Sequence, residues 1–158
     1  MGSGKTTLGK KIANKLNKSF FDLDAEIELL EKMKVAEIFQ SKGEGYFRNL
    51  ESDVLQEITT NNQDYVMSLG GGTPCFNDNL ILINQSGTSI YLKYNSGMLA
   101  SRLINSKTER PLLKGLNEEE LNHFVANKLN EREEYYNQSD YILEGNNIKI
   151  EDVTNLVQ

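Results

Sequence analysis

The first seven residues, MGSGKTT, constrain this chain most, because they have the pattern of a phosphate-binding loop that runs into a helix. Gly2 and Gly4 allow a tight backbone turn whose N–H groups point at phosphate oxygens. The following helix adds its positive N-terminal end. In this pattern Lys5 reaches the outer phosphates and the Thr6 hydroxyl binds Mg²⁺. The stretch therefore predicts a phosphate site at the start of the chain.

The loop pattern is incomplete on its N-terminal side. The full pattern is G-x-x-x-x-G-K-[ST], and its first glycine would lie just before residue 1, together with the strand that should lead into the loop. The same letters could also be a Gly/Ser leader left from expression. Leu8, Ile12 and Leu16 follow at helical spacing, which favours the phosphate loop and predicts a first helix over residues 5–16.

Composition limits the partners of the chain. The 158 residues suit one domain with a sizeable core. A net charge of −6 disfavours a broad nucleic-acid surface, so any phosphate site has to be built locally. No apolar run approaches the roughly 18 residues that span a bilayer and no signal peptide is visible, so we expect no membrane association. Cys75 is the only cysteine, which fits a reducing, cytoplasmic location.

Two carboxylates end the first predicted strand. Residues 19–24, SFFDLD, have the pattern of a short buried strand. Asp22 and Asp24 share strand parity, so both should face one side at its carboxyl end. Ligands bind at that end of the strands in open α/β sheets. The alternative is that Asp24 only caps the helix expected over residues 25–32. Beside a phosphate loop we favour a functional role.

A pair of opposite charges lies on the next helical segment. Residues 35–39 begin a short helix that stops near Gly43, and residues 44–58 form an amphipathic helix with one apolar stripe. Arg48 and Glu51 border that stripe, three residues apart. The simplest interpretation is a surface ion pair of little energetic value.

Three glycines follow the next predicted strand, residues 65–69. Glycine is costly in backbone entropy, and a plain turn needs only one or two. The run Gly70-Gly71-Gly72 therefore favours a ligand that lies against bare backbone over a flexible loop.

The rest of the chain continues to alternate strands and helices. Strands are predicted over residues 88–92 and 141–143, and helices over 80–84, 96–104, 117–136 and 150–157. Asn117 and Glu120 make a variant capping box on the long helix, where Arg132 borders the apolar stripe. The basic stretch 105–116 suits a mobile lid or, alternatively, a solvated connection. This alternation predicts a single domain over residues 1–158 with a parallel, three-layer α/β sheet.

Together these stretches resemble the shikimate kinase family from end to end. Six matching segments occur in the family's order and at its approximate spacing: MGSGKTT, FFDLDAEIE, VAEIFQSKGEGYFRNLE, SLGGGTP, ERPLL and NEREEYYNQSDY. The resemblance implies a three-layer P-loop kinase fold with a parallel sheet in the order 2-3-1-4-5. It also implies transfer of the γ-phosphate of ATP to the 3-hydroxyl of shikimate, a step of aromatic amino-acid biosynthesis.

The resemblance implies roles at the nucleotide site. Lys5 matches the family's phosphate lysine, Thr6 and Asp22 match its Mg²⁺ site, and Arg110 matches the lid arginine that closes over the phosphates. Arg102 would lie against adenine. The remaining residues around the phosphates would be Gly2, Ser3, Gly4 and Thr7.

On the acceptor side, the resemblance implies that Arg48 and Arg132 hold the shikimate carboxylate and that Asp24 holds hydroxyls. A planar guanidinium suits a carboxylate because it can bind both oxygens. Lys5, Asp24 and Arg110 would carry catalysis by alignment and charge neutralisation, and whether Asp24 takes a proton or only positions the hydroxyl stays open. The pocket would be completed by Phe39, Phe47 and the backbone of Gly70, Gly71 and Gly72.

The chain departs from the family at its start. The family's first strand and first loop glycine have no counterpart, and that strand lies between the strands predicted near Tyr65 and Thr88. We expect either about ten further, mostly apolar residues upstream of Met1, or a slot filled by rearrangement or by a partner's strand. With that strand restored we expect a monomer.

Two other functions stay open. Another small P-loop kinase, for gluconate or a nucleotide, would share Lys5, Thr6 and Arg110. It would not share the joint set Asp24, Arg48, Gly71-Gly72 and Arg132. A non-catalytic nucleotide- or shikimate-binding protein, inactive because the first strand is missing, would keep the acceptor residues but would release no ADP.

Overall fold

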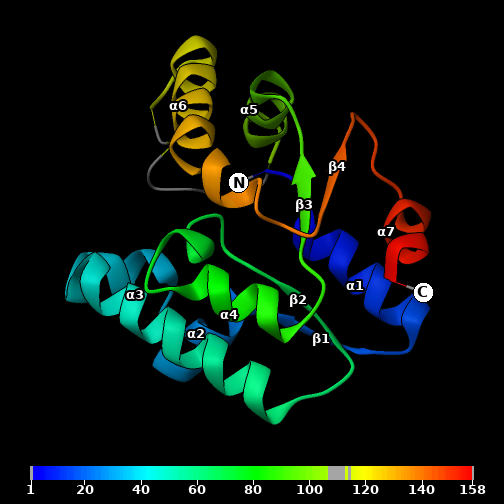
Figure 1. Ribbon diagram of the computed structural model, residues 1–158. Coiled ribbons are helices and arrows are strands. Elements are labelled where there is room, and N and C mark those ends of the chain that lie inside the picture. The colour runs from blue at the N-terminus through cyan, green and yellow to red at the C-terminus, as the bar shows by residue number, and fades with distance from the viewer. Residues whose placement is uncertain (1, 107–112, 114, 158) are drawn as a thin grey trace.

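The computed structural model describes residues 2–106, 113 and 115–157, and every predicted helix and strand is present (Figure 1). Boundaries differ from the expected ones by a few residues. The strands are β1 (Ser19–Asp22), β2 (Tyr65–Ser68), β3 (Ile90–Lys93) and β4 (Tyr141–Glu144). The helices are α1 (Lys5–Leu16), α2 (Leu23–Glu31), α3 (Val35–Asn61), α4 (Asn79–Ser86), α5 (Ser96–Ile104), α6 (Glu118–Tyr136) and α7 (Ile150–Val157), with a short 3₁₀ turn, η1, over Thr73–Cys75.

The strands pair in parallel, as predicted, but in two halves. β1 pairs with β2 in a register that sets Asp22 beside Ser68, and β3 pairs with β4. Within the described ranges no strand joins β2 to β3, so each of these two strands has one unpaired edge. The observed neighbours are those of the predicted order once its central strand is left out.

Helices cover both faces of the β1–β2 pair because side chains alternate along a strand. Phe20 points to α1: a Cβ at Gly9 would lie 2.8 Å from the Phe20 ring, so a larger residue at this helix position would push the ring aside. Phe21 points the other way, into a cluster with α2 and α3. The result is the predicted three-layer α/β/α arrangement.

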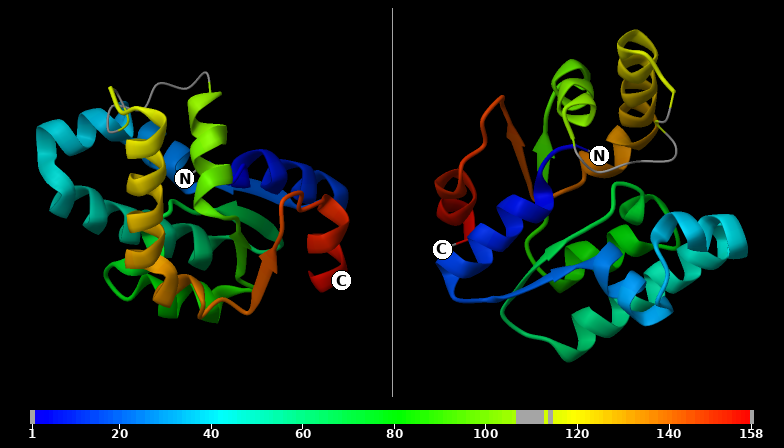
Figure 2. Two further views of the ribbon diagram at one scale, coloured as in Figure 1. Left: turned by 90° about the horizontal axis from the view of Figure 1, so that it is seen from above. Right: turned by 180° about the vertical axis from the view of Figure 1, so that it is seen from behind.

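Two apolar clusters form the core. The first joins α2 to α3 and consists of Leu23, Ile27, Ile38, Phe47, Val54, Leu55 and Ile58. The second joins the end of β3 to α5 and α6 and consists of Tyr94, Leu99, Ala100, Leu103, Leu121 and Val125. α5 and α6 pack side by side in each view (Figure 2). No helix of the described residues is long and apolar enough to cross a membrane.

Two local predictions from the sequence are confirmed. α3 is interrupted at Gly43, which has a φ of 83°. The space around Gly43 is open, so the left-handed backbone rather than crowding favours glycine there. At the start of α6, the Asn117 side chain accepts from the Glu120 N–H and the Glu120 carboxylate accepts from the Asn117 N–H.

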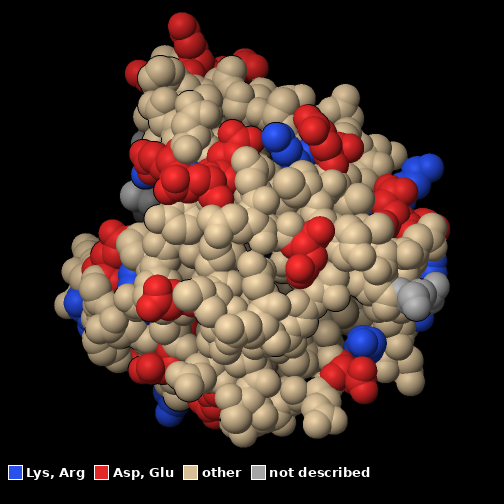
Figure 3. Space-filling model, in the orientation of Figure 1, with Lys and Arg blue, Asp and Glu red and all other residues tan. Residues whose placement is uncertain are grey.

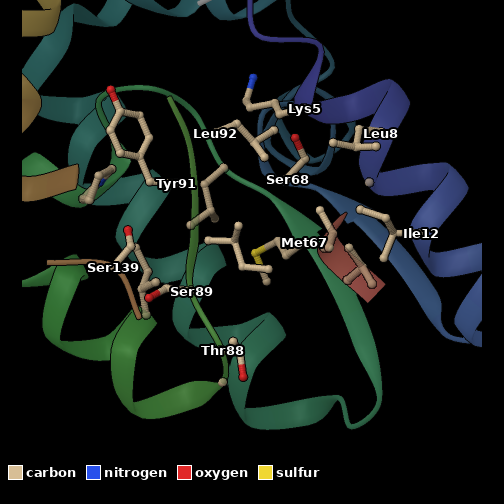
Figure 4. A pocket seen from close by; sticks show the side chains of 18 of the residues that line it. Lys5, Leu8, Ile12, Met67, Ser68, Thr88, Ser89, Tyr91, Leu92 and Ser139 are labelled. Atoms are coloured by element: carbon tan, nitrogen blue, oxygen red, sulfur yellow. The ribbon is translucent and has the colours of Figure 1, made fainter. Parts of the chain in front are cut away.

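An apolar slot separates the two half-sheets (Figure 4). It has a volume of about 560 Å³. Leu8 and Ile12 of α1, Met67 of β2 and Leu92 of β3 line it, and Lys5 and Ser68 stand at one end. The slot lies between β2 and β3, where the family order implies a central strand. No described segment fills the slot. The unpaired edges of β2 and β3 therefore face each other across it, between apolar side chains.

Filling the slot should stabilise the protein strongly. We expect a version extended by a short apolar strand, ending in Gly-x before Met1, to melt at least about 10 °C higher. Burying several apolar side chains contributes about 1.5–3 kcal/mol each, and 1 kcal/mol corresponds to about 2–4 °C at this size. Thermal unfolding by circular dichroism measures the difference.

The matched control carries an extension of equal length in which prolines and aspartates replace the apolar residues, so that it cannot pair or pack. Equal melting temperatures for the apolar and control extensions would show that the slot does not receive a strand.

Candidate active site

The phosphate loop has the backbone that its pattern predicts. Gly2 and Gly4 have φ values of 71° and 78°, a region that favours glycine. A Cβ at Gly2 would also lie 3.2 Å from the Leu99 carbonyl oxygen. Among the described residues no side chain caps the first turn of α1, so its N–H groups are left for an anion.

A hydroxyl and a carboxylate meet beside this loop. Thr6 Oγ1 donates to Asp22 Oδ2 over 2.6 Å, and Thr6 Oγ1 lies 3.5 Å from Ser68 Oγ. The other Asp22 oxygen accepts from the Ala25 N–H and caps α2. Thr6 and Asp22 thus fit the oxygen ligands that Mg²⁺ takes alongside phosphates and water. The described residues contain no cluster of three or more acidic, histidine or cysteine side chains that could hold a metal without such help.

Asp24 lies at the site, but not for the reason that its spacing suggested. The expected common strand parity with Asp22 is wrong, because the strand ends at Asp22 and Asp24 is in the first turn of α2. The suggestion that Asp24 caps this helix is also wrong, since Asp22 does so. From the helix, Asp24 Oδ1 reaches within 3.1 Å of the position that a Cβ at Gly70 would take. The carboxylate therefore lies against the glycine run.

The surroundings of Asp24 favour its protonated form. Burial raises the pKa of Asp24 above its ordinary value, and this effect outweighs the attraction of Lys5, which lowers the pKa. The nearby carboxylates of Asp22, Glu51 and Glu28 raise the pKa further. Asp24 is therefore a better proton acceptor than an exposed aspartate whenever it is ionised.

Arg48 and Glu51 form a largely buried pair, so the surface ion pair considered from the sequence is wrong. Arg48 Nη1 donates to Glu51 Oε2 over 2.8 Å, and the Glu51 side chain is only 1% exposed. The second Glu51 oxygen accepts from the Thr73 hydroxyl over 2.7 Å. Both Glu51 oxygens are therefore satisfied, which fixes one side of the Arg48 guanidinium.

Aromatic rings and a glycine frame the Arg48 guanidinium. Its carbon lies 4.1 Å from the ring centre of Phe76 and 5.2 Å from that of Phe47, and the centres of Phe39 and Phe47 are 4.5 Å apart. A Cβ at Gly72 would lie 2.7 Å from Arg48 Nη2, so any other residue at position 72 would displace the guanidinium. Apolar walls and bare backbone therefore adjoin one cation.

Arg132 of α6 lies at the same pocket. Its positive charge acts on the Tyr136 hydroxyl and on the Cys75 thiol beside the glycine run, and lowers the pKa of both groups against the effect of burial. Arg48 acts on Cys75 as well, so the two arginines converge there. The Tyr136 hydroxyl donates to the Gly71 carbonyl oxygen and thereby ties α6 to the glycines. Burial raises the pKa of Tyr136, which keeps this donor protonated.

Arg102 marks a second hollow, on the other side of the loop. It has a volume of about 560 Å³, and its lining includes Ser3, Thr7 and residues 147–151. The Arg102 guanidinium stacks over Tyr94, with 4.3 Å between its carbon and the ring centre, and donates to the Ser3 carbonyl oxygen over 3.3 Å. A flat cation held against the phosphate loop suits a stacked base.

The cations of the site belong to a chain that carries more acidic than basic residues. On the face shown in Figure 3, acidic side chains gather over α6. The chain as a whole has a net charge of −6. The predicted cations Lys5, Arg48 and Arg132 are therefore local positive groups on an acidic protein, which suits binding of small anions.

Most predicted site residues come together at the carboxyl ends of β1 and β2. Arg110, and with it most of the 105–116 lid, lies outside the described residues. The structure also adds side chains that the sequence analysis did not assign to the site. Thr73 donates to Glu51 and Tyr136 donates to the Gly71 carbonyl oxygen, while the rings of Tyr94 and Phe76 lie against Arg102 and Arg48. Thr73 and Phe76 both follow the glycines within four residues, which was the one available signal.

A phosphate loop at the carboxyl end of a parallel three-layer sheet defines a P-loop kinase fold. The family model of shikimate kinase matches residues 1–158, and the chain belongs to that family. The shikimate kinase of Azobacteroides pseudotrichonymphae is 48% identical over 142 residues, which are 90% of this chain and 84% of the relative. That of Flavobacterium psychrophilum is 42% identical over 144 residues, again 90% of this chain and 84% of the relative.

Solved structures agree in fold. The shikimate kinase of Bacteroides thetaiotaomicron superimposes with a TM-score of 0.91 at 40% identity, covering 99% of this chain and 91% of the other. The Acinetobacter baumannii enzyme in complex with shikimate gives a TM-score of 0.86 at 31% identity, covering 99% and 86%. These likenesses confirm the predicted fold class and family.

The raised pKa of Asp24 predicts a pH-dependent stability. The folded state holds this proton more tightly than the unfolded chain, so stability is lost as the pH rises from about 4 through the raised pKa. Asp24→Asn cannot ionise. We expect it to melt above the parent at pH 7 and level with it below about pH 4.

Asp53→Asn, an exposed change on α3, is the matched control and should move the melting temperature little at either pH. A lower melting temperature for Asp24→Asn at pH 7, or an equal gain at both pH values, would contradict the burial of this charge.

Proposed function

We propose that this chain binds ATP and shikimate together and transfers the γ-phosphate to the 3-hydroxyl of shikimate. The observation that carries this proposal is the position of Asp24. Its carboxylate lies within the electrostatic reach of Lys5 on the phosphate loop and contacts the glycine run beside Arg48. A phosphate donor and a hydroxylated, anionic acceptor would therefore meet at one carboxylate.

The acceptor half of the site suits each group of shikimate. Arg48 and Arg132 supply two guanidinium groups for the carboxylate, and charge-assisted hydrogen bonds of this kind are among the strongest in proteins. Asp24 accepts from ring hydroxyls. Phe39 and Phe47 cover the apolar ring face, and the absence of side chains at Gly70, Gly71 and Gly72 lets the substrate approach the backbone.

The donor half holds and aligns the nucleotide. The α1 N–H groups and the turn around Gly2, Ser3 and Gly4 surround the phosphates, Lys5 reaches the outer ones, and Thr7 lies beside them. Arg102 stacks against the base. Mg²⁺ bound by Thr6 and through Asp22 would neutralise phosphate charge. We assign Arg110 to the same task from the lid.

Asp24 performs the step that the rest of the site prepares. Its carboxylate accepts the hydrogen bond of the 3-hydroxyl and orients that oxygen toward the phosphate. Lys5 offsets the negative charge of the phosphates and of the Asp24 carboxylate. Its raised pKa also allows it to take the hydroxyl proton as the new phosphate ester forms. Alignment remains the larger contribution, because phosphoryl transfer needs mainly positioning and charge stabilisation.

A substrate panel tests the proposed function. ADP release is measured with ATP and Mg²⁺ in the presence of shikimate, gluconate or nucleoside monophosphates, both for this chain and for a version extended upstream by an apolar strand and a complete loop. We expect shikimate-dependent ADP release from the complete-loop version and none with the other acceptors. Phosphorylation of gluconate or a nucleotide without phosphorylation of shikimate would overturn the proposal.

Two arginine variants should separate the two halves of the site. Arg132→Ala should weaken shikimate binding by about 10- to 100-fold, since it removes a charged hydrogen-bond partner worth about 1.5–3 kcal/mol. ATP binding should change less than about twofold, because Arg132 is not among the residues that line the hollow beside Arg102 and the phosphate loop. Arg102→Ala should weaken ATP binding and leave shikimate binding nearly unchanged. Calorimetric titration of each variant with each ligand measures both effects.

An Arg132→Ala variant that binds shikimate as the parent does would return Arg132 to a surface role. Equal weakening of both ligands by both variants would indicate a general loss of structure instead.

A further inference from the structure

The Arg48 guanidinium, which carries five N–H groups, makes three hydrogen bonds to two glutamates, and its far end lies against the Gly72 backbone. Nη1 donates to Glu51 Oε2 over 2.8 Å. Nε and Nη2 both donate to Glu44 Oε1, over 3.2 and 3.1 Å. The backbone of Gly72 lies against the end that carries both Nη atoms, since a Cβ there would be 2.7 Å from Nη2 and 2.9 Å from Nη1. The Nε–Nη2 edge is therefore the one that a planar carboxylate can approach side-on.

The two glutamates that bind Arg48 differ in burial and in how firmly they are held. Glu51 is buried, with a side chain 1% exposed, and its second oxygen is bound by Thr73. Glu44 is 57% exposed, and one of its oxygens accepts both of these bonds. A buried ion pair does not readily give up one partner, because the other charge would stay buried without a counter-charge. Exposed pairs one helical turn apart are weak. Glu51 thus holds the Arg48 guanidinium in place, and the Glu44 carboxylate can give up its two hydrogen bonds to Arg48.

Glu44 also lies where α3 is easiest to adjust. It directly follows Gly43, at which the helix is interrupted, and it precedes Gly45. The space around both glycines is open. The Glu44 side chain can therefore swing into solvent without disturbing the buried cluster under Phe47.

We propose that Glu44 stands in for the substrate carboxylate on Arg48. In the free protein it occupies the Nε–Nη2 edge, which keeps the guanidinium extended over Phe76. The shikimate carboxylate exchanges with Glu44 on binding, and Glu44 turns to solvent. This inference rests on the proposed function and adds to it a residue that sets the affinity for anionic acceptors. Glu44 lowers that affinity because it competes for the edge and repels an approaching carboxylate.

Glu44→Gln tests this assignment, since glutamine keeps the size and loses the charge. We expect its dissociation constant for shikimate to fall by about two- to fivefold, the range of an exposed ion pair, with ATP binding unchanged. Glu57→Gln removes the same charge from an exposed position on the same helix and should bind both ligands as the parent does. Calorimetric titrations of the three proteins give the comparison.

A second ligand distinguishes competition from a packing effect. The analogue whose carboxylate is reduced to an alcohol cannot exchange with Glu44, so Glu44→Gln should bind it no more tightly than the parent does. Weaker or unchanged shikimate binding by Glu44→Gln, or equal tightening toward the uncharged analogue, would overturn the inference.

The contact can also be followed without a substrate. In the free protein, Glu44→Gln should shift the NMR signal of the Arg48 Nε–H, and Glu57→Gln should not. An unmoved signal would overturn the inference by itself. Failure of all three proteins to bind shikimate would instead contradict the proposed function, while the Arg48 signal would still report on Glu44.

Discussion

The hydrogen bond from Thr6 to Asp22 is the contact on which the site depends. The parallel register of β1 and β2 sets Asp22 beside Ser68, and Thr6 lies within reach of both. The first turn of α1 is thereby held at the carboxyl end of the sheet, where its free N–H groups and Lys5 meet the residues that follow each strand. Asp22 also caps α2, so the same carboxylate determines where Asp24 lies.

The acceptor pocket is organised by charges that the fold leaves little freedom to rearrange. Glu51 is buried because Arg48 and Thr73 satisfy both of its oxygens, and Arg48 in turn is held between Glu51, the Phe76 ring and the Gly72 backbone. Removing one member of such a set leaves a buried charge without a partner, which costs about 3–5 kcal/mol. The arginine is therefore positioned before any substrate arrives, which reduces the ordering that binding requires.

Local sequence rules predicted the elements but not all of the contacts between them. Helical spacing predicted α1 with the bounds that it has, Lys5–Leu16. Asp24 was assigned to the strand because period-two alternation was extended past Asp22, whose side chain in fact begins the helix. Glu51 was expected on the surface because an i, i+3 pair carries no information on what covers it. The cover is the η1 turn with Thr73, 22 residues later in the chain. The bond from Tyr136 to Gly71 spans 65 residues and has no local pattern at all.

In the sheet, too, single strands could be predicted from local sequence, but the arrangement of the strand pairs could not. Each strand was predicted from its own apolar run, and the neighbours β1–β2 and β3–β4 follow the family order. The slot between the two pairs is a property of both half-sheets together, and only the resemblance to a family indicated it.

The central claim is that one carboxylate, Asp24, joins the phosphate site to the acceptor pocket, and the position of the phosphate on the product tests it most directly. The complete-loop version is incubated with ATP, Mg²⁺ and shikimate, and the product is examined by phosphorus and proton NMR. The account predicts a single phosphate ester on the 3-hydroxyl, and no such product from Asp24→Asn. Ester formation on another hydroxyl, or an unchanged product yield from Asp24→Asn, would contradict it.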